Sequence, residues 1–242
     1  MNAAPFRRAI LDFFLPPKCP FCGRKPDSPE PEGPCSACLS RLKFLRSPRC
    51  PCCGVAFPSP SDSDHLCAEC LTEERPFRRA RAVCAYEGLI IEVLSKLKYG
   101  GLTRLAKPLG KLLADYQDPE FSLSESDLVV PVPLHPARLR ERGFNQSVLL
   151  ARQVSRRCSI PINFTALHRT RQTQPQTQLS GAERRKNVRG AFEVRKTKEV
   201  EGKRILLIDD VFTTGATSQE CASALREAGA SEVHVLTLAR VA

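Results

Sequence analysis

Four Cys-x2-Cys pairs within the first 70 residues constrain the folding of this chain more than any other feature. The pairs are Cys19 and Cys22, Cys35 and Cys38, Cys50 and Cys53, and Cys67 and Cys70. Two of them recur in one pattern, CPFCG and CPCCG, whose glycine lets the backbone turn toward the thiolates. Because four thiolates at this spacing form a tetrahedral Zn2+ site, the four pairs predict two structural zinc sites.

The pattern leaves alternatives open. Sequential pairing would place the first two pairs on one zinc and the last two on the other, whereas a cross-braced arrangement would interleave them. Cys52 and His65 lie within reach as substitute ligands, and we expect both to be bystanders. A disulfide scaffold is the other interpretation, but nothing indicates export and a reducing cytosol leaves thiols free for metal. This proline-rich segment has few core-forming residues, so metal should supply on the order of 10 kcal/mol of its folding free energy.

Charge is distributed unevenly along the 242 residues, whose net charge is +11. Residues 1–80 hold 12 Lys or Arg and 9 Asp or Glu, whereas residues 81–242 hold 25 and 17. The basic second part predicts anionic partners such as phosphates, nucleotides or nucleic acid. The weak charge of the cysteine-rich part argues against direct reading of nucleic acid by that part. We therefore divide the chain into residues 1–78 and 79–242.

The apolar stretches are short. No run of about 18 apolar residues is present, so membrane insertion is not expected. The segment Ala9–Leu15 is too short for a secretory signal and is followed by prolines and cysteines. A cytoplasmic location is the expectation.

Helical and strand patterns alternate in the second part. Helices are expected at Leu89–Tyr99, Leu102–Tyr116 (with Pro108 at a kink or start), Asn145–Arg157 and Thr217–Ala230, and strands at Arg204–Asp209 and Glu232–Arg240. The stretch Asp127–His135 is expected to be an apolar strand that runs into a proline-bounded loop. A short β–α–β unit of this kind predicts an α/β fold with a parallel sheet and a right-handed crossover.

The stretch KRILLIDDVFTTGAT carries the chemistry. Ligands bind beyond the carboxyl ends of parallel strands, where we expect Asp209 and Asp210 to face solvent. The following loop enters a helix N-terminus, so its backbone N–H groups and hydroxyls can surround a phosphate; it comprises Thr213, Thr214, Gly215, Ala216 and Thr217. Carboxylates beside a phosphate would repel it unless they hold a ribose diol or Mg2+. This predicts a sugar 5-phosphate ligand; the alternative is an ordinary strand–turn–helix with solvated aspartates.

ILLIDDVFTTGAT resembles the phosphoribosyl-pyrophosphate (PRPP) signature of type I phosphoribosyltransferases. Together with the cysteine pairs, the segments VPVPLHPARLRERGFNQS and RTRQTQPQTQLSGAERRKNVRGAF resemble the ComF family, competence-associated proteins with a double zinc ribbon fused to that fold. The resemblance implies that Asp209 and Asp210 hold the ribose hydroxyls, directly or through Mg2+, and that Thr213–Thr217 hold the 5-phosphate. It also implies that the loop after the Val129–Pro133 strand binds the pyrophosphate, with Arg138 and Arg142 as the residues matched to pyrophosphate binding. Arg142 is grouped with Asp209 and Asp210 as catalytic.

The segment His168–Gly190 is strongly basic, with six Lys or Arg against one acid and no apolar periodicity. It is either a solvated linker or a mobile lid that brings Arg169, Arg171 or the run Arg184–Lys186 over the pyrophosphate and excludes water. Phosphoribosyl transfer passes through an oxocarbenium-like state, so it needs charge neutralisation on the leaving group more than a protein nucleophile.

Two classes of function remain open. The first is an enzyme that transfers phosphoribose from PRPP to an unknown acceptor, linked to DNA uptake by the family resemblance. The second is a non-catalytic module that binds PRPP or single-stranded DNA and works with DNA-uptake proteins.

Type I enzymes carry a hood, built partly from terminal segments, that binds the base. Since the sequence runs only two residues past Arg240, either the zinc ribbon replaces the hood or there is no base pocket.

Overall fold

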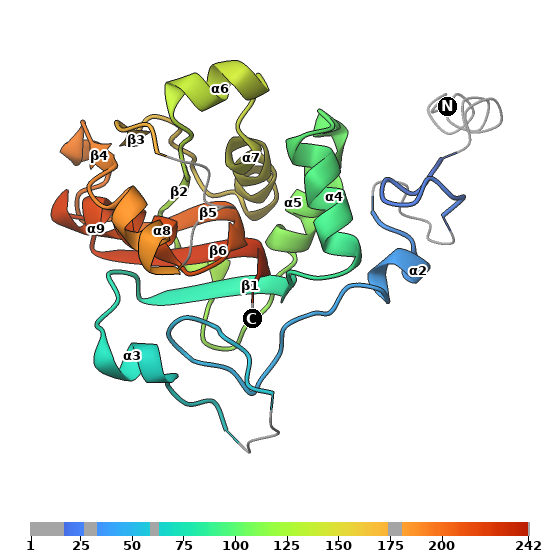
Figure 1. The fold of residues 1–242 in the computed structure, drawn as a ribbon, viewed down its shortest axis with the longest axis horizontal. Coiled ribbons are helices and arrows are strands. Elements are labelled where there is room, and N and C mark those ends of the chain that lie inside the picture. The colour runs from blue at the N-terminus through green and yellow to red at the C-terminus, as the bar shows by residue number, and fades with distance from the viewer. Residues whose placement is uncertain (1–16, 27–32, 59–62, 174–180, 242) are drawn as a thin grey trace, which may run out of the picture.

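The computed structural model describes residues 17–26, 33–58, 63–173 and 181–241, so the Ala9–Leu15 segment lies outside it (Figure 1). Its described part contains a parallel four-stranded sheet of order β1-β6-β5-β2 and a small antiparallel pair. The sheet strands are β1 (Arg79–Ala85), β6 (Glu232–Arg240), β5 (Arg204–Phe212) and β2 (Leu128–Pro131); the pair is β3 (Leu167–Arg169) and β4 (Phe192–Val194). The prediction of a parallel α/β fold is confirmed.

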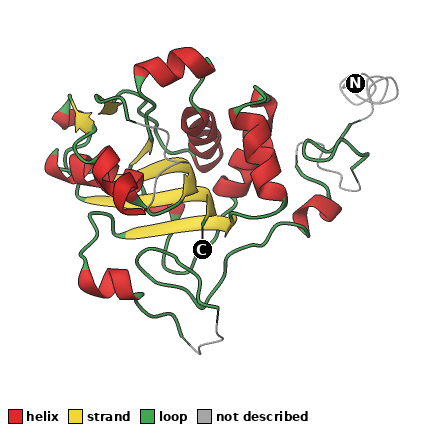
Figure 2. Ribbon diagram, viewed as in Figure 1, coloured by secondary structure: helices red, strands yellow, loops and turns green. Residues whose placement is uncertain are grey.

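Helices cover both faces of the sheet, as Figure 2 shows. They are α4 (Leu89–Lys98), α5 (Ala106–Ala114), α6 (Pro136–Arg142), α7 (Gln146–Cys158), α8 (Gly181–Val188) and α9 (Ala216–Glu227), with 3-10 turns at Thr103–Leu105, Leu123–Glu125 and Thr197–Glu199. Alternate side chains of β5 point to opposite faces. Leu206 and Ile208 join the core with α4, α5 and α7, whereas Ile205 and Leu207 join the core with α9. Burial on both faces explains why the run Ile205–Ile208 is entirely apolar.

The strand containing the acidic pair is longer than predicted. β5 continues past the apolar run to Phe212 because β6 pairs with it as far as Arg240. Asp209 and Asp210 therefore lie inside the strand, at 9% and 4% exposure. The expectation that both side chains face solvent is wrong.

β2 ends at Pro131, and the proline-bounded loop predicted to follow this strand leads on to His135. The segment His168–Gly190, which has no apolar periodicity, contributes β3 and the helix α8, and residues 174–180 within it lie outside the described residues.

Among the described residues, every helix is too short or too polar to cross a membrane.

The cysteine-rich segment covers the outer edge of the sheet. Its short helices are α2 (Ser36–Leu39) and α3 (Ala68–Thr72), which lie toward opposite ends of β1 in Figure 1. Near the start of β1, the Ala80 N–H donates to the Cys52 carbonyl at 2.7 Å; near its end, the Ala85 N–H donates to the Lys43 carbonyl at 2.8 Å. These contacts satisfy backbone groups that an uncovered edge strand would expose.

A buried ion network also fastens this segment to the sheet. The Asp118 carboxylate oxygen Oδ2 lies 2.6 Å from Arg49 Nη2 and 2.5 Å from Arg81 Nε, and Arg81 Nη1 donates to the Pro51 carbonyl at 2.9 Å. Burial opposes ionisation of Asp118, but the hydrogen bonds from the Glu120 N–H and from Arg81 outweigh it and lower the Asp118 pKa. Removing one partner would leave an uncompensated buried charge.

Candidate functional site

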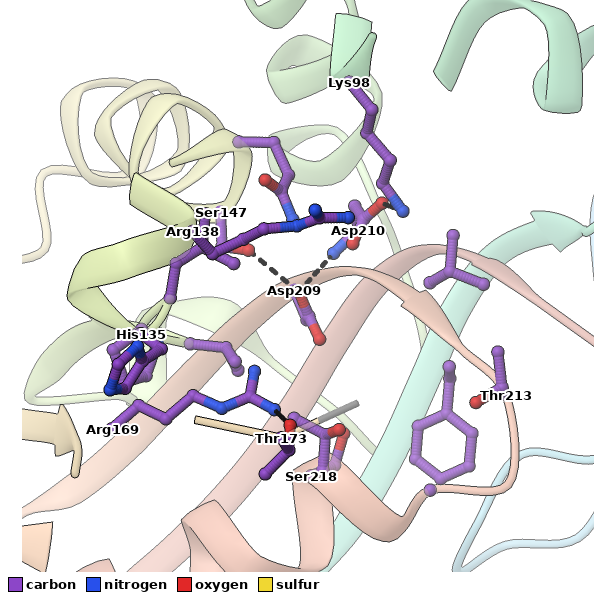
Figure 3. A pocket seen from close by; sticks show the side chains of 18 of the residues that line it. Lys98, His135, Arg138, Ser147, Arg169, Thr173, Asp209, Asp210, Thr213 and Ser218 are labelled. Carbon is purple, nitrogen blue, oxygen red and sulfur yellow. Dashed lines mark hydrogen bonds and ion pairs between the residues drawn. The ribbon is translucent and has the colours of Figure 1, made fainter. Parts of the chain in front are cut away.

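A cavity of about 630 Å³ opens at the carboxyl ends of β5 and β2 (Figure 3). Its walls come from the end of α4, the loop after β2, the start of α6, the segment after β3 and the first turn of α9. This is the edge at which parallel α/β folds bind their ligands. Of the residues predicted for the site, Asp209, Asp210, Thr213, Gly215, Thr217 and Arg138 line this cavity.

The acidic pair is held by groups from two helices. Asp209 Oδ1 accepts hydrogen bonds from Ser147 Oγ of α7 at 2.8 Å and from the Asp210 N–H at 2.9 Å. Asp210 Oδ2 forms an ion pair with Lys98 Nζ at the end of α4. The two carboxylates are therefore bound differently, since one accepts neutral donors and the other meets a cation.

Burial and the neighbouring charges shift the pKa of Asp209 and the pKa of Lys98. Burial and the neighbouring Asp210 carboxylate raise the pKa of Asp209 to about 7, against a smaller opposing effect from the Ser147 hydroxyl. Burial disfavours the charged form of Lys98, but the Asp210 carboxylate outweighs it and raises the Lys98 pKa. The site therefore holds the ion pair between Lys98 and Asp210 beside the Asp209 carboxyl group, which titrates near neutral pH.

The loop after β5 connects the strand directly to a helix N-terminus, as expected from the sequence. It leads into α9, whose 12 residues direct a helix N-terminus toward the cavity. Gly215 has φ +77°, and a Cβ atom there would lie 2.5 Å from Phe212 Cζ, so only glycine fits. Thr214 and Ala216 are not among the described residues that line the cavity; Thr214 Oγ1 accepts from the Ala216 N–H at 3.4 Å within the loop.

The two arginines matched to pyrophosphate have different positions. Arg138 on α6 lines the cavity and forms an ion pair with Glu141 at 2.7 Å. Arg142 is not among the described lining residues: its Nη1 donates to Gln146 Oε1 at 2.7 Å, and its guanidinium lies 5.4 Å from the centre of the Tyr99 ring. His135, which also lines the cavity, caps α6 by accepting from the Ala137 N–H at 3.2 Å.

The basic segment contributes one arginine to the described cavity. Arg169 of β3 enters it and donates a hydrogen bond to Thr173 Oγ1, and burial lowers its pKa. Arg171 instead donates to the carbonyls of Asn187 and Arg189, at 3.2 and 2.7 Å. The side chains of Arg184 and Arg185 lie outside the described residues.

Lys98, Ser147, Thr173 and Ser218 line the cavity but were not singled out from the sequence. Lys98 and Ser147 occupy ordinary positions in amphipathic helices, with nothing local to connect them to Asp209 or Asp210. Only the packing of α4 and α7 against the sheet brings these side chains to the acidic pair.

The cysteines form two separate four-thiol clusters. Cys19, Cys22, Cys35 and Cys38 make the first, and Cys50, Cys53, Cys67 and Cys70 make the second, with the ligand atoms of each cluster within 4.8 Å of one another. Sγ–Sγ distances of 3.7 and 3.8 Å match the edge of a tetrahedron with Zn–S bonds of about 2.3 Å, which is about 3.8 Å.

The sequential pairing of the cysteines is therefore confirmed. Gly23 and Gly54 have φ values of +74° and +71°, so the repeated glycine makes the predicted turn. Cys52 is outside both clusters, and the His65 ring stacks on Phe57 with the ring centres 4.0 Å apart.

Comparison with known proteins agrees with both parts of the structure. Residues 10–71 match the double zinc ribbon domain model, and residues 145–242 match the phosphoribosyl transferase domain model. The chain is 34% identical over 212 residues to the DNA utilization protein YhgH of Escherichia coli K12, and 31% identical over 212 residues to competence protein F of Haemophilus influenzae. Each alignment covers 86% of this chain and 90% of the relative. Competence protein ComFC of Bacillus subtilis is 31% identical over 227 residues, 89% of this chain and 86% of the relative.

A solved structure of glutamine PRPP amidotransferase from B. subtilis matches 53% of this chain and 25% of its own, at 32% identity and a TM-score of 0.36. The fold, the two four-cysteine sites and the domain matches define a phosphoribosyltransferase-type protein with a double zinc ribbon. This chain belongs to the ComF family.

Proposed function

We propose that this protein binds PRPP in the cavity and transfers its phosphoribosyl group to an acceptor in the uptake or utilization of DNA. The observation that carries the proposal is the placement of Asp209 and Asp210 beside a helix N-terminal loop at the carboxyl end of β5. The names of the relatives, which refer to competence and DNA utilization, support the biological setting.

The cavity offers a place for each part of PRPP. The 5-phosphate would lie against Thr213–Thr217 at the start of α9, where backbone N–H groups and the helix dipole favour an anion. The ribose hydroxyls would donate to Asp209 and Asp210. The pyrophosphate would lie toward the loop after β2 and would be contacted by Arg138 and Arg169, which both line the cavity.

The acidic pair also fits Mg2+, which binds one or two carboxylates together with substrate oxygens. Asp209 is the better candidate ligand because Asp210 is already neutralised by Lys98. A bound Mg2+ ion would supply charge neutralisation for the pyrophosphate and orient the ribose hydroxyls.

The arrangement suits a dissociative transfer. As the bond between C1 and the pyrophosphate oxygen breaks, positive charge develops on the ribose ring and negative charge on the leaving group. Asp209 and Asp210 would hold the ribose in place, and Arg138 and Arg169 would stabilise the pyrophosphate as it leaves. No protein nucleophile is needed for this reaction.

We expect PRPP affinity to increase with pH through about 7, because that is where Asp209 ionises. The charged carboxylate is the better acceptor for the ribose hydroxyls and the better Mg2+ ligand. Replacing Ser147 by alanine removes a hydrogen bond that favours the ionised form, so the Asp209 pKa should increase further and the midpoint should move to higher pH. Calorimetric titrations of PRPP at a series of pH values would measure the affinity of the wild type and of S147A. Because the titration of PRPP itself affects both proteins equally, a difference between their pH profiles reports on Asp209. Identical profiles would contradict the prediction.

A second function is favoured by the net charge of +11, which resides largely in residues 81–242. In it the protein is a non-catalytic module, and the basic segment contacts single-stranded DNA. Such binding depends on phosphate contacts and weakens steeply with salt.

A triple variant distinguishes the two functions; in it, glutamine replaces Arg184, Arg185 and Lys186. For an enzyme with a catalytic lid, we expect unchanged ground-state PRPP binding and slower pyrophosphate release, because the lid charges act on the leaving group. For a DNA-binding module, the same variant should weaken DNA binding and flatten its salt dependence by about 0.7 log units for each DNA phosphate that the variant no longer neutralises.

The matched control replaces Arg195, Lys196 and Lys198, which removes the same charge near the amino end of β5, away from the cavity. Wild-type protein that binds DNA with a steep salt slope, but releases no pyrophosphate with any acceptor tested, would exclude the enzyme. Turnover of PRPP together with weak DNA binding would exclude the module.

A further inference from the structure

Arg240, the last residue of β6, contacts a cysteine of the second four-cysteine cluster. Its Nη1 donates to the Cys53 carbonyl at 2.9 Å, and its Nη2 donates to Cys53 Sγ at 3.8 Å. Cys53 belongs to the cluster formed with Cys50, Cys67 and Cys70. Hydrogen bonds of this kind orient metal ligands, so the arginine is placed to sense whether the cluster is assembled around its metal.

The same guanidinium lies on the ring of Phe212, with Cζ 4.4 Å from the ring centre. Phe212 is 4% exposed, and Phe77 meets the ring edge-on with the ring centres 6.2 Å apart. A desolvated cation over an aromatic face is among the stronger contacts of this type. Arg240 and Phe77 therefore fix the orientation of this ring.

Phe212 in turn supports the loop proposed to bind phosphate. Gly215 lies so close to the ring that an added Cβ would be 2.5 Å from Phe212 Cζ. The Val241 N–H donates to the Phe212 carbonyl at 3.0 Å, so the residue after Arg240 holds the backbone at the same place. Phe212 also lines the cavity. Any shift of the ring would change the position of Gly215 and of the loop around it.

The first cluster has different surroundings. Cys19, Cys35 and Cys38 pack into the core that contains α4, α5 and α7, whereas Cys50 and Cys53 pack into the core that contains Phe212 and Ala216. Within the described chain, the second cluster is thus the one joined to the phosphate loop through Arg240.

We propose that Arg240 is a positioning residue that couples the metal site of the second ribbon to the phosphate loop. When metal holds Cys53 in place, the guanidinium holds the Phe212 ring beneath Gly215. When the metal is removed, Cys53 moves, the ring is released, and the loop no longer presents its N–H groups to an anion. The identity of that anion as the 5-phosphate of PRPP rests on the proposed function, whereas the coupling itself does not.

The test uses the full-length zinc-loaded protein and two readouts. Hydrogen exchange of the peptide covering residues 212–217 reports the order of the loop, and calorimetry with PRPP reports its use. We expect Arg240→Met to speed exchange of the loop amides about tenfold and to weaken PRPP binding about tenfold. Cys67→Ser, which removes a ligand of the second cluster but replaces neither Arg240 nor its hydrogen-bond partner Cys53, should have the same two effects.

Arg226→Met is the matched control. Arg226 also donates to backbone carbonyls, those of Ala230 and Ser231, but it lies before β6 rather than at its end. It should leave loop exchange and PRPP affinity unchanged. If Arg240→Met does not fold, Arg240→Lys is the alternative, because it keeps the charge and one hydrogen bond to Cys53 but removes the planar guanidinium from the Phe212 ring. For this variant we expect the loop amides to exchange faster than in the wild type, by less than tenfold.

The outcomes separate this inference from the proposed function. Loop exchange in the Arg240 variant equal to that of the wild type would overturn the coupling, whether or not PRPP binds. Faster loop exchange in Arg240→Met and Cys67→Ser, in a protein whose wild type does not bind PRPP, would support the coupling and refute the proposed ligand.

Discussion

Replacing Asp209 and Asp210 together by asparagine is expected to weaken PRPP binding by at least about 100-fold. Each carboxylate would accept a charge-assisted hydrogen bond from a ribose hydroxyl, and such a bond contributes about 1.5–3 kcal/mol. Two of them correspond to about 3 kcal/mol or more, which is about two powers of ten in affinity. Calorimetric titration of PRPP in the presence of Mg2+ measures the change.

The folded state will also respond to this substitution, because both side chains are buried. Asp210→Asn leaves Lys98 without its ionic partner, which should lower Tm, whereas Asp209→Asn removes a buried carboxyl group next to a like charge and should partly offset that decrease. The matched control is Asp115→Asn with Asp127→Asn, which makes the same two substitutions at residues outside the cavity lining. PRPP affinity that is unchanged in D209N/D210N would remove the ligand assignment.

Removing zinc should have the largest effect on stability. We expect about two zinc ions per chain, and we expect chelation to unfold the cysteine-rich segment while the parallel sheet largely remains. The metal supplies on the order of 10 kcal/mol to modules of this kind, and the described part of this segment contains only two short helices. Metal analysis, far-ultraviolet circular dichroism and hydrogen exchange would follow the change, with restored zinc as the control.

The contacts between the ribbon and the sheet refine this expectation. Arg49 and Arg81 share the buried Asp118, and Arg240 contacts Cys53, so unfolding of the second ribbon should also lower the Tm of the remaining domain. Less than one zinc per chain together with oxidised cysteines would contradict the metal assignment. Complete unfolding of the sheet on chelation would show that residues 79–242 do not fold without the ribbon.

The sequence predicted the features that depend on local chemistry. Cys-x2-Cys spacing was enough to predict two four-cysteine sites, although it left the pairing open, and the continuous apolar run Ile205–Ile208 was enough to predict a buried parallel strand. The helix beginning after Asn145 was also predicted within a residue at each end, because Asn145 is an N-cap whose side chain accepts from the Ser147 N–H at 2.9 Å.

Features that depend on distant packing were missed. The burial of Asp209 and Asp210 arises because β6 extends the pairing of β5 beyond its apolar run, which no local pattern indicates. Lys98 precedes Asp210 by 112 positions, and Ser147 precedes Asp209 by 62, so only the packing of α4 and α7 brings them into the site. The path from Cys53 through Arg240 to Phe212 joins the two parts of the chain in the same way.

The central claim is that the cavity at the end of β5 binds PRPP, and calorimetric titration of the zinc-loaded wild-type protein tests it most directly. With Mg2+ present, we predict saturable one-to-one binding of PRPP and weaker binding of ribose 5-phosphate, which lacks the pyrophosphate that Arg138 and Arg169 would contact. No heat of binding for PRPP, in protein that carries both zinc ions and is fully folded, would contradict the claim.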